Sequence, residues 1–269
     1  MISGPLYRNG IKANVTLFIV ISAVIAMYFV VVTGMFDPKF SAALEQLTAT
    51  MPAMPQLMAM FGMDKPVTTL IDFISSYLYG MIMLMFPMIF TFITANRLVA
   101  RNVDRGFMAY LLAAPVSRRT VATTQAAVLI TGTSSVVAFA TLVGIAAAQG
   151  FFPGELDIDR FLLLNLGALT LHLFIAGISF LSSCALNDSR TSSGLGAGIP
   201  ILAFVIQMLA NTSDKLTKAR YFTFFTLFNP DGIIAGQPGA VWGMAALAVG
   251  AVVLFAAAIA VFASKDIPV

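Results

Sequence analysis

The chain has 269 residues, of which 59% are hydrophobic and only 10% are charged. Soluble domains carry about 25% charged residues, so this composition, with a mean hydropathy of +0.93, excludes an ordinary soluble domain. It predicts an all-α integral membrane protein. The formal net charge of +3 is expected to reflect membrane orientation, and nucleic acid is not expected as a partner. The single cysteine, Cys184, excludes an internal disulfide.

The first feature in chain order is a short segment, residues 4–14, that mixes apolar and basic side chains. Tyr7 and Ile11 supply an apolar side, whereas Arg8 and Lys12 are cations. This pattern is typical of a helix that lies in the lipid headgroup region, where Lys and Arg reach the phosphates. We therefore expect an N-terminal interfacial helix.

Six apolar runs follow, each close to the length of about 20 residues that crosses a bilayer. They cover residues 15–36, 70–95, 123–148, 161–186, 194–210 and 239–262. The first run has a longer apolar core than a signal peptide, so we expect it to remain as an anchor. We interpret residues 1–269 as a single transmembrane domain, and six spans place both termini on one side.

A basic stretch separates the second and third runs. Val103, Phe107 and Leu111 follow one another at a spacing of four, which predicts an amphipathic helix over residues 101–113. Pro115 would end this helix. Arginines outnumber acids around the helix, which marks a cytoplasmic loop; the charged residues here are Arg97, Arg101, Asp104, Arg105, Arg118 and Arg119.

Ser117 is predicted to cap the third membrane helix by accepting a hydrogen bond from the amide near Thr120. Arg118 and Arg119 then lie just inside the start of that helix, where cations oppose the helix dipole. Local stability does not explain them, but anionic lipid or an acidic partner would. A purely topological role for the arginines is the simpler interpretation, and a docking surface is the one we favour.

The distribution of Lys and Arg predicts the orientation. If both termini are cytoplasmic, nine cations lie inside and six outside, which together make the 15 of the chain. Lys and Arg concentrate on the cytoplasmic side of membrane proteins. The inner set is Arg8, Lys12, Arg97, Arg101, Arg105, Arg118, Arg119, Arg190 and Lys265.

Two long outer segments, residues 37–68 and 211–238, connect the spans. The first is rich in Met; its thioethers suit Cu(I), but an adaptable apolar surface is the better interpretation. The second concentrates aromatic residues, which favour a membrane interface or an outer gate, before the turn signal at residues 229–232. The candidate gate residues are Phe222, Phe224, Phe225 and Phe228.

The spans offer few ionisable side chains for catalysis or ion coupling. Proton and ion relays depend on intramembrane charged or basic groups, and here only His172 and Asp72 fall within a span. We interpret His172 as a hydrogen-bonded interior residue and Asp72 as an outer helix-start residue. We predict no catalytic residues, no metal ligands and no cofactor bound by this chain.

The order of these features resembles the permease subunits of ABC-2 type transporters. Residues 105–119, RGFMAYLLAAPVSRR, are similar to the family's G-[x]-L-L-x-x-P-V-S-R element between spans two and three. Residues 227–230, LFNP, are similar to the family's L-x-P region before the last span. The resemblance covers nearly the whole chain, although it depends on order and topology more than on identity.

The resemblance implies a dimer of permeases, homomeric or heteromeric, that binds two copies of a cytosolic ATPase in a bacterial plasma membrane. Residues 4–14 would be the elbow helix and residues 101–113 the coupling helix, with ATP and Mg bound by the partner. The chain has no G-x-x-x-x-G-K-[ST] motif, which agrees with an ATPase on another chain. The implied docking residues are Arg101, Asp104, Arg105, Phe107, Met108, Leu111, Arg118 and Arg119.

Export of a hydrophobic or amphipathic substrate is therefore the expected function. A secondary transporter or channel without an ATPase is the first alternative. An integral membrane enzyme is the second, but the spans lack the paired carboxylates, metal ligands or activated nucleophile that an enzyme needs.

Overall fold

The computed structural model describes residues 2–36, 59–60, 67, 69–106, 108, 116–212 and 214–265. Regular structure within these residues is helical, without strands. Six helices are long and apolar enough to cross a membrane, which confirms a multi-pass helical protein. They are α1 (Gly4–Gly34), α5 with α6 (Ile82–Leu98 and Ala100–Asp104), α8 (Arg118–Phe151), α9 (Ile158–Ala185), α10 (Ser189–Thr212) and α12 (Pro238–Ser264).

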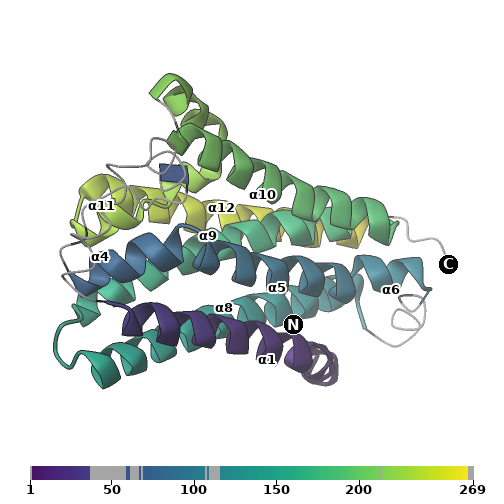
Figure 1. The fold of residues 1–269 in the computed structure, drawn as a ribbon. Helices are drawn as coiled ribbons and strands as arrows, with labels where there is room; N and C mark the ends of the chain where they lie inside the picture. The colour runs from purple at the N-terminus through teal and green to yellow at the C-terminus, as the bar shows by residue number, and fades with distance from the viewer. Residues whose placement is uncertain are drawn as a thin grey trace.

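The long helices run side by side in one bundle (Figure 1). Helix α9 lies at its centre and packs against α5, α8, α10 and α12. The short helices α4 (Leu70–Ile74) and α11 (Pro230–Ile234) lie at one end, and α6 lies at the other (Figure 1). The first turns of α1 and the last turns of α12 lie toward the end that carries α6, as an even number of helices crossing the bundle requires (Figure 1).

The second span is broken, which the apolar run 70–95 did not predict. Helix α4 leads into a π-helix, η1 (Ser75–Tyr79), and the backbone then leaves helical geometry at Met81, where φ is −142° and ψ is −57°. Helix α5 begins at Ile82 and contains Pro87. π-turns inside helices are frequent at functional sites, and this one lines the cavity described below.

The predicted cap of the third membrane helix is confirmed. Ser117 precedes α8 and its Oγ accepts a hydrogen bond from the Thr120 amide at 3.1 Å. The 34 residues of α8 extend for about 51 Å at 1.5 Å per residue. That length exceeds the hydrocarbon core of about 30 Å, so α8 extends beyond the membrane.

Two predicted helices differ in the structure. Residues 4–14 form no separate helix, because α1 runs without a break from Gly4 to Gly34; its first turns are seen almost end-on in Figure 1, whereas the rest crosses the view. The helix predicted over residues 101–113 is also interrupted. Helix α6 ends at Asp104, and Gly106 adopts a φ of +72°, a left-handed conformation that ends a helix.

The outer segment before the last span folds back onto the bundle. It forms two 3-10 helices, η2 (Asp214–Phe222) and η3 (Phe224–Leu227), and then α11. Asn229 caps α11 by accepting a hydrogen bond from the Gly232 amide at 3.1 Å, with Pro230 as the first helical residue. The predicted turn signal therefore starts a short helix before the chain enters α12.

Candidate functional site

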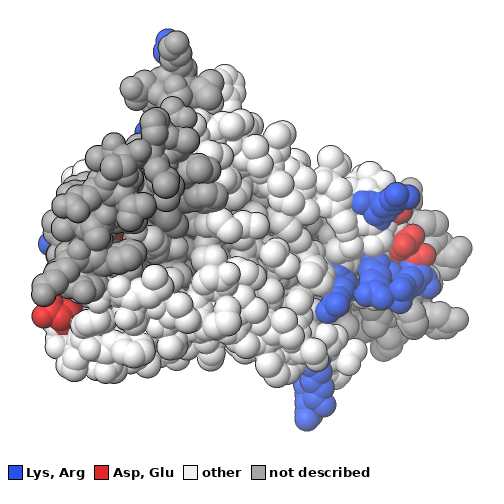
Figure 2. All heavy atoms as spheres, in the orientation of Figure 1, with Lys and Arg blue, Asp and Glu red and all other residues white. Residues whose placement is uncertain are grey.

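Cations gather at the end of the bundle that carries α6 (Figure 2). Within the described residues, none of the exposed cations at this end forms an ion pair. The charge of Arg190 helps to lower the pKa of the neighbouring Asp188, but cations outnumber acids on this surface. The surface is therefore available to anionic lipid or to an acidic protein surface. The exposed cations are Arg8, Lys12, Arg97, Arg105, Arg119 and Arg190.

The structure places the predicted docking residues in different environments. Arg101 is half-buried on α6, whereas Asp104 and Arg105 are exposed. Met108 is fully buried and belongs to the apolar cluster that includes Val103, so it packs within the bundle rather than on an open surface. Phe107 and Leu111 lie outside the described residues.

Arg118 and Lys265 have structural partners that the sequence did not reveal. The Arg118 guanidinium donates to the Lys265 carbonyl at 2.6 Å, and Lys265 Nζ donates to the Cys184 carbonyl at 3.2 Å. Both acceptors lie at helix C-termini, where cations are favourable, and burial lowers the pKa of Lys265. Arg118 therefore joins α8 to the end of α12, while Arg119 stays exposed.

The predicted elbow residues have the expected amphipathic division. Tyr7 and Ile11 are half-buried against the bundle, and the Tyr7 hydroxyl donates to Thr131 Oγ1 on α8 at 3.0 Å. Arg8 and Lys12 are exposed. The first turns of α1 are therefore attached to the bundle on one side and present cations on the other.

A serine-rich network beside α6 joins α5, α9 and α10. The Asn96 amide donates to Ser193 and its oxygen accepts from Ser189 at 2.9 Å. Ser182 donates to the Ser192 carbonyl at 3.0 Å, and Ser179 to the Gly196 carbonyl at 2.8 Å. Side-chain hydrogen bonds of this kind hold membrane helices together. The clustered serines were the available signal in the sequence.

Asp188 begins α10 next to this network. Its carboxylate accepts hydrogen bonds from the side chain and amide of Thr191, which lower the pKa of Asp188. The carboxylate therefore remains ionised well below neutral pH and caps α10.

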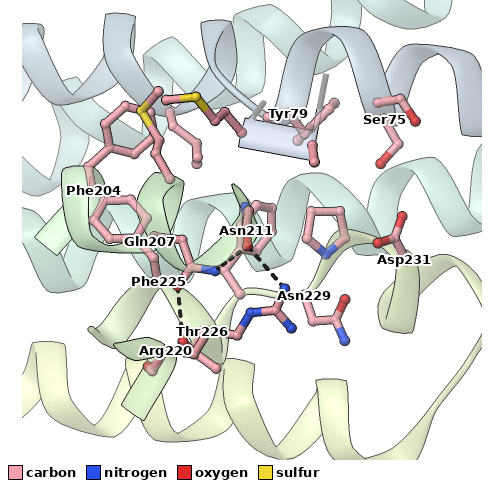
Figure 3. Close-up of a pocket in the computed structure, with 18 residues that line it drawn as sticks. Ser75, Tyr79, Phe204, Gln207, Asn211, Arg220, Phe225, Thr226, Asn229 and Asp231 are labelled. Atoms are coloured by element: carbon pink, nitrogen blue, oxygen red, sulfur yellow. Dashed lines mark hydrogen bonds between the residues drawn. The ribbon is translucent and has the colours of Figure 1, made fainter. Parts of the chain in front are cut away.

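The opposite end of the bundle contains a cavity of about 320 Å³ between η1, α5, α10, η2, η3 and α11 (Figure 3). Apolar and polar side chains divide its wall. Tyr79, Leu84, Phe204 and Phe225 are on the apolar side. The polar side includes Ser75, Gln207, Asn211, Arg220, Thr226, Asn229 and Asp231.

The predicted gate aromatics divide between this cavity and the surface. Phe225 and Phe228 are buried and line the cavity. Phe224 stacks on Phe225 with ring centroids 4.9 Å apart, and Phe225 lies 5.6 Å from Phe204. Phe222 is 82% exposed, as expected of an interfacial residue.

His172 has a structural explanation. It is fully buried on α9, and its Nε2 lies 2.7 Å from the Met83 carbonyl oxygen. Residue 87 would normally supply the amide for that carbonyl, but Pro87 has none. His172 therefore donates from Nε2 to a backbone acceptor that the proline leaves without its helical donor, as membrane helices require. The sequence predicted a hydrogen-bonded interior histidine but not its partner, for which the proline within the span was the available signal.

Asp72 is in the first turn of α4, as predicted for a helix-start residue. The Thr69 hydroxyl accepts from the Asp72 amide at 3.3 Å and donates to its carboxylate at 2.7 Å. No set of three His, Cys, Asp or Glu side chains suited to a metal ion occurs within the described parts of the chain.

No protein-family model matches this chain, and no curated protein matches it.

Proposed function

We propose that this chain is the membrane-spanning permease subunit of an ATP-driven exporter of the ABC-2 type. The observation that carries the proposal is the exposed basic surface around α6, which has no ion pairs within the described residues. A surface of this charge at the end of a transmembrane helix suits docking of a cytosolic protein. We propose that both termini and α6 face the cytoplasm of a bacterial plasma membrane, since this end holds most of the cations.

The sequence has no nucleotide-binding motif that could supply energy for transport, which supports an ATPase on a partner chain. The sequence contains no P-loop. His172, the one histidine of the spans, is fully buried and so closed to solvent; its Nε2 donates to the Met83 carbonyl and its Nδ1 has no hydrogen-bond partner among the described residues. A secondary transporter would need an intramembrane group free to exchange protons or ions. We propose a dimer of permease chains with two ATPase copies, each of which binds ATP and Mg.

The contacts of α6 suggest how motion would cross the membrane. Helix α6 packs against both α5 and α10, and the far end of α10 contributes Gln207 and Asn211 to the outer cavity. ATP binding would close the ATPase pair and shift α6. Helices α5 and α10 would then carry this shift to the outer cavity and open the path for a hydrophobic or amphipathic substrate.

The test is a charge reversal on α6 and its end. Arg101→Glu with Arg105→Glu should reduce copurification of the ATPase at least tenfold, because an acidic patch would replace the basic docking surface. The measurement is the ATPase-to-permease ratio after affinity purification in mild detergent.

The matched control is Lys218→Glu with Arg220→Glu, which reverses two exposed cations of η2 at the opposite end of the bundle. The control should retain the ATPase. The docking assignment is wrong if both double variants behave like the unmodified protein, or if both lose the ATPase equally. Size-exclusion profiles of all three proteins show whether the permease itself stays folded.

A further inference from the structure

We propose that the outer cavity binds the anionic headgroup of an amphiphile, with Arg220 and Asn211 as the groups that contact it. The binding itself does not depend on an ATPase. Only the further step, that this amphiphile is the exported substrate, rests on the proposed export function.

The part of the polar wall around Arg220 presents donors rather than acceptors. Asn211 Oδ1 accepts hydrogen bonds from Arg220 Nη2 at 3.2 Å and from Gln207 Nε2 at 3.3 Å (Figure 3). Arginine is a pure donor, so the oxygen of Asn211 must face it and the amide nitrogen faces elsewhere. Within the described residues, no protein acceptor contacts this nitrogen.

Arg220 keeps most of its hydrogen-bonding capacity. A guanidinium has five N–H donors, and the Arg220 side chain makes one hydrogen bond and no ion pair among the described residues. The Gln207 carbonyl oxygen is already occupied by the Thr226 hydroxyl at 3.0 Å. The amide oxygens of this network are thus used, and the donors of Arg220 and Asn211 remain for an anion.

The cavity also has an apolar wall, which leads away from the polar groups into the bundle. Gln207 and Asn211 lie in the last turns of α10, whereas Phe204 is seven residues before Asn211 and so about 10 Å deeper. Leu84 and Phe225 line the same apolar side. An amphiphile would place its headgroup at Arg220 and the start of its chain at Phe204.

The size of the cavity limits the ligand. Its volume of about 320 Å³ lies within the range of small-ligand sites. This volume fits a phosphodiester or carboxylate headgroup with the first carbons of its chain.

The experiment is a titration of the purified permease in neutral detergent with dihexanoyl phosphatidylglycerol. The reporter is Trp242, the single tryptophan of the chain, which lines a hollow that shares Thr226 and Asn229 with the cavity. Its fluorescence should change saturably. Arg220→Gln should weaken binding at least tenfold. Arg220→Lys should weaken it less, because lysine keeps the positive charge but loses the two parallel N–H donors of the guanidinium.

The control variant is Lys218→Gln, which removes an exposed cation of the same 3-10 helix that does not line the cavity. It should bind like the unmodified protein. Equal binding by Arg220→Gln overturns the site. Glycerol phosphate, a headgroup without chains, should bind at least tenfold more weakly; equal binding would show a site for a free anion and overturn the amphiphile.

The titration separates this proposal from the proposed function. Arg101→Glu with Arg105→Glu should bind the probe normally, because α6 is at the opposite end of the bundle. Saturable binding without any ATPase partner would support the headgroup site and leave the export function to its own test. No binding by the unmodified protein overturns the headgroup site alone.

Discussion

Replacing His172 with leucine should lower the free energy of unfolding by about 1–3 kcal/mol, the cost of a buried acceptor left unsatisfied. The acceptor is the Met83 carbonyl oxygen, which lies 2.7 Å from His172 Nε2. This carbonyl lacks its usual helical donor, because Pro87 has no amide hydrogen. His172→Gln keeps an N–H donor of similar reach and should recover part of the loss. Thermal unfolding in detergent measures the differences.

A double-mutant cycle with Pro87→Ala tests the cause directly. Alanine at position 87 restores the backbone amide that the Met83 carbonyl lacks, so His172→Leu should cost much less in the Pro87→Ala background. An equal cost in both backgrounds would mean that His172 contributes packing alone. Loss of transport from His172→Leu with unchanged stability would instead support a relay role.

Gly243→Ala should destabilise the protein by about 3 kcal/mol or more, at the upper end of overpacking effects. A Cβ at Gly243 would lie 2.2 Å from the Leu227 carbonyl oxygen, a backbone atom that no rotamer change can move. The clash would push η3 away from α12. Because Thr226 and Phe225 of η3 line the outer cavity, headgroup binding should weaken as well.

The matched control is Gly239→Ala on the same helix, where a Cβ would meet nothing within 4 Å. Its stability should be unchanged or slightly higher, since alanine favours a helix over glycine. Thermal unfolding of both variants in one detergent gives the comparison. A melting temperature for Gly243→Ala equal to that of Gly239→Ala would contradict the close approach of α12 and η3.

The sequence predicted the features that depend on local pattern. The apolar runs marked all six long helices, and Ser117 followed by Thr120 marked the start of α8. These signals depend on residues close together in the chain. The break at Met81 has no comparable signal, because Gly80 and the apolar residues around it also suit a continuous helix.

The features that the sequence did not predict arise from contacts between distant segments. The Arg118–Lys265 contact joins residues 147 apart in the chain. The outer cavity combines residues of η1, α10, η2, η3 and α11, so no single segment shows its division into donors and apolar groups. Met108 lies next to the apolar positions of the amphipathic pattern and was expected on the docking surface, yet tertiary packing buries it.

The measurement that tests the central proposal most directly is affinity purification of the tagged protein from its native membrane, followed by mass spectrometry of the bound proteins. We predict a soluble protein with a P-loop in a one-to-one ratio with the permease. Absence of such a protein, under conditions that preserve other membrane complexes, would contradict the proposal. The basic surface around α6 would then serve orientation alone.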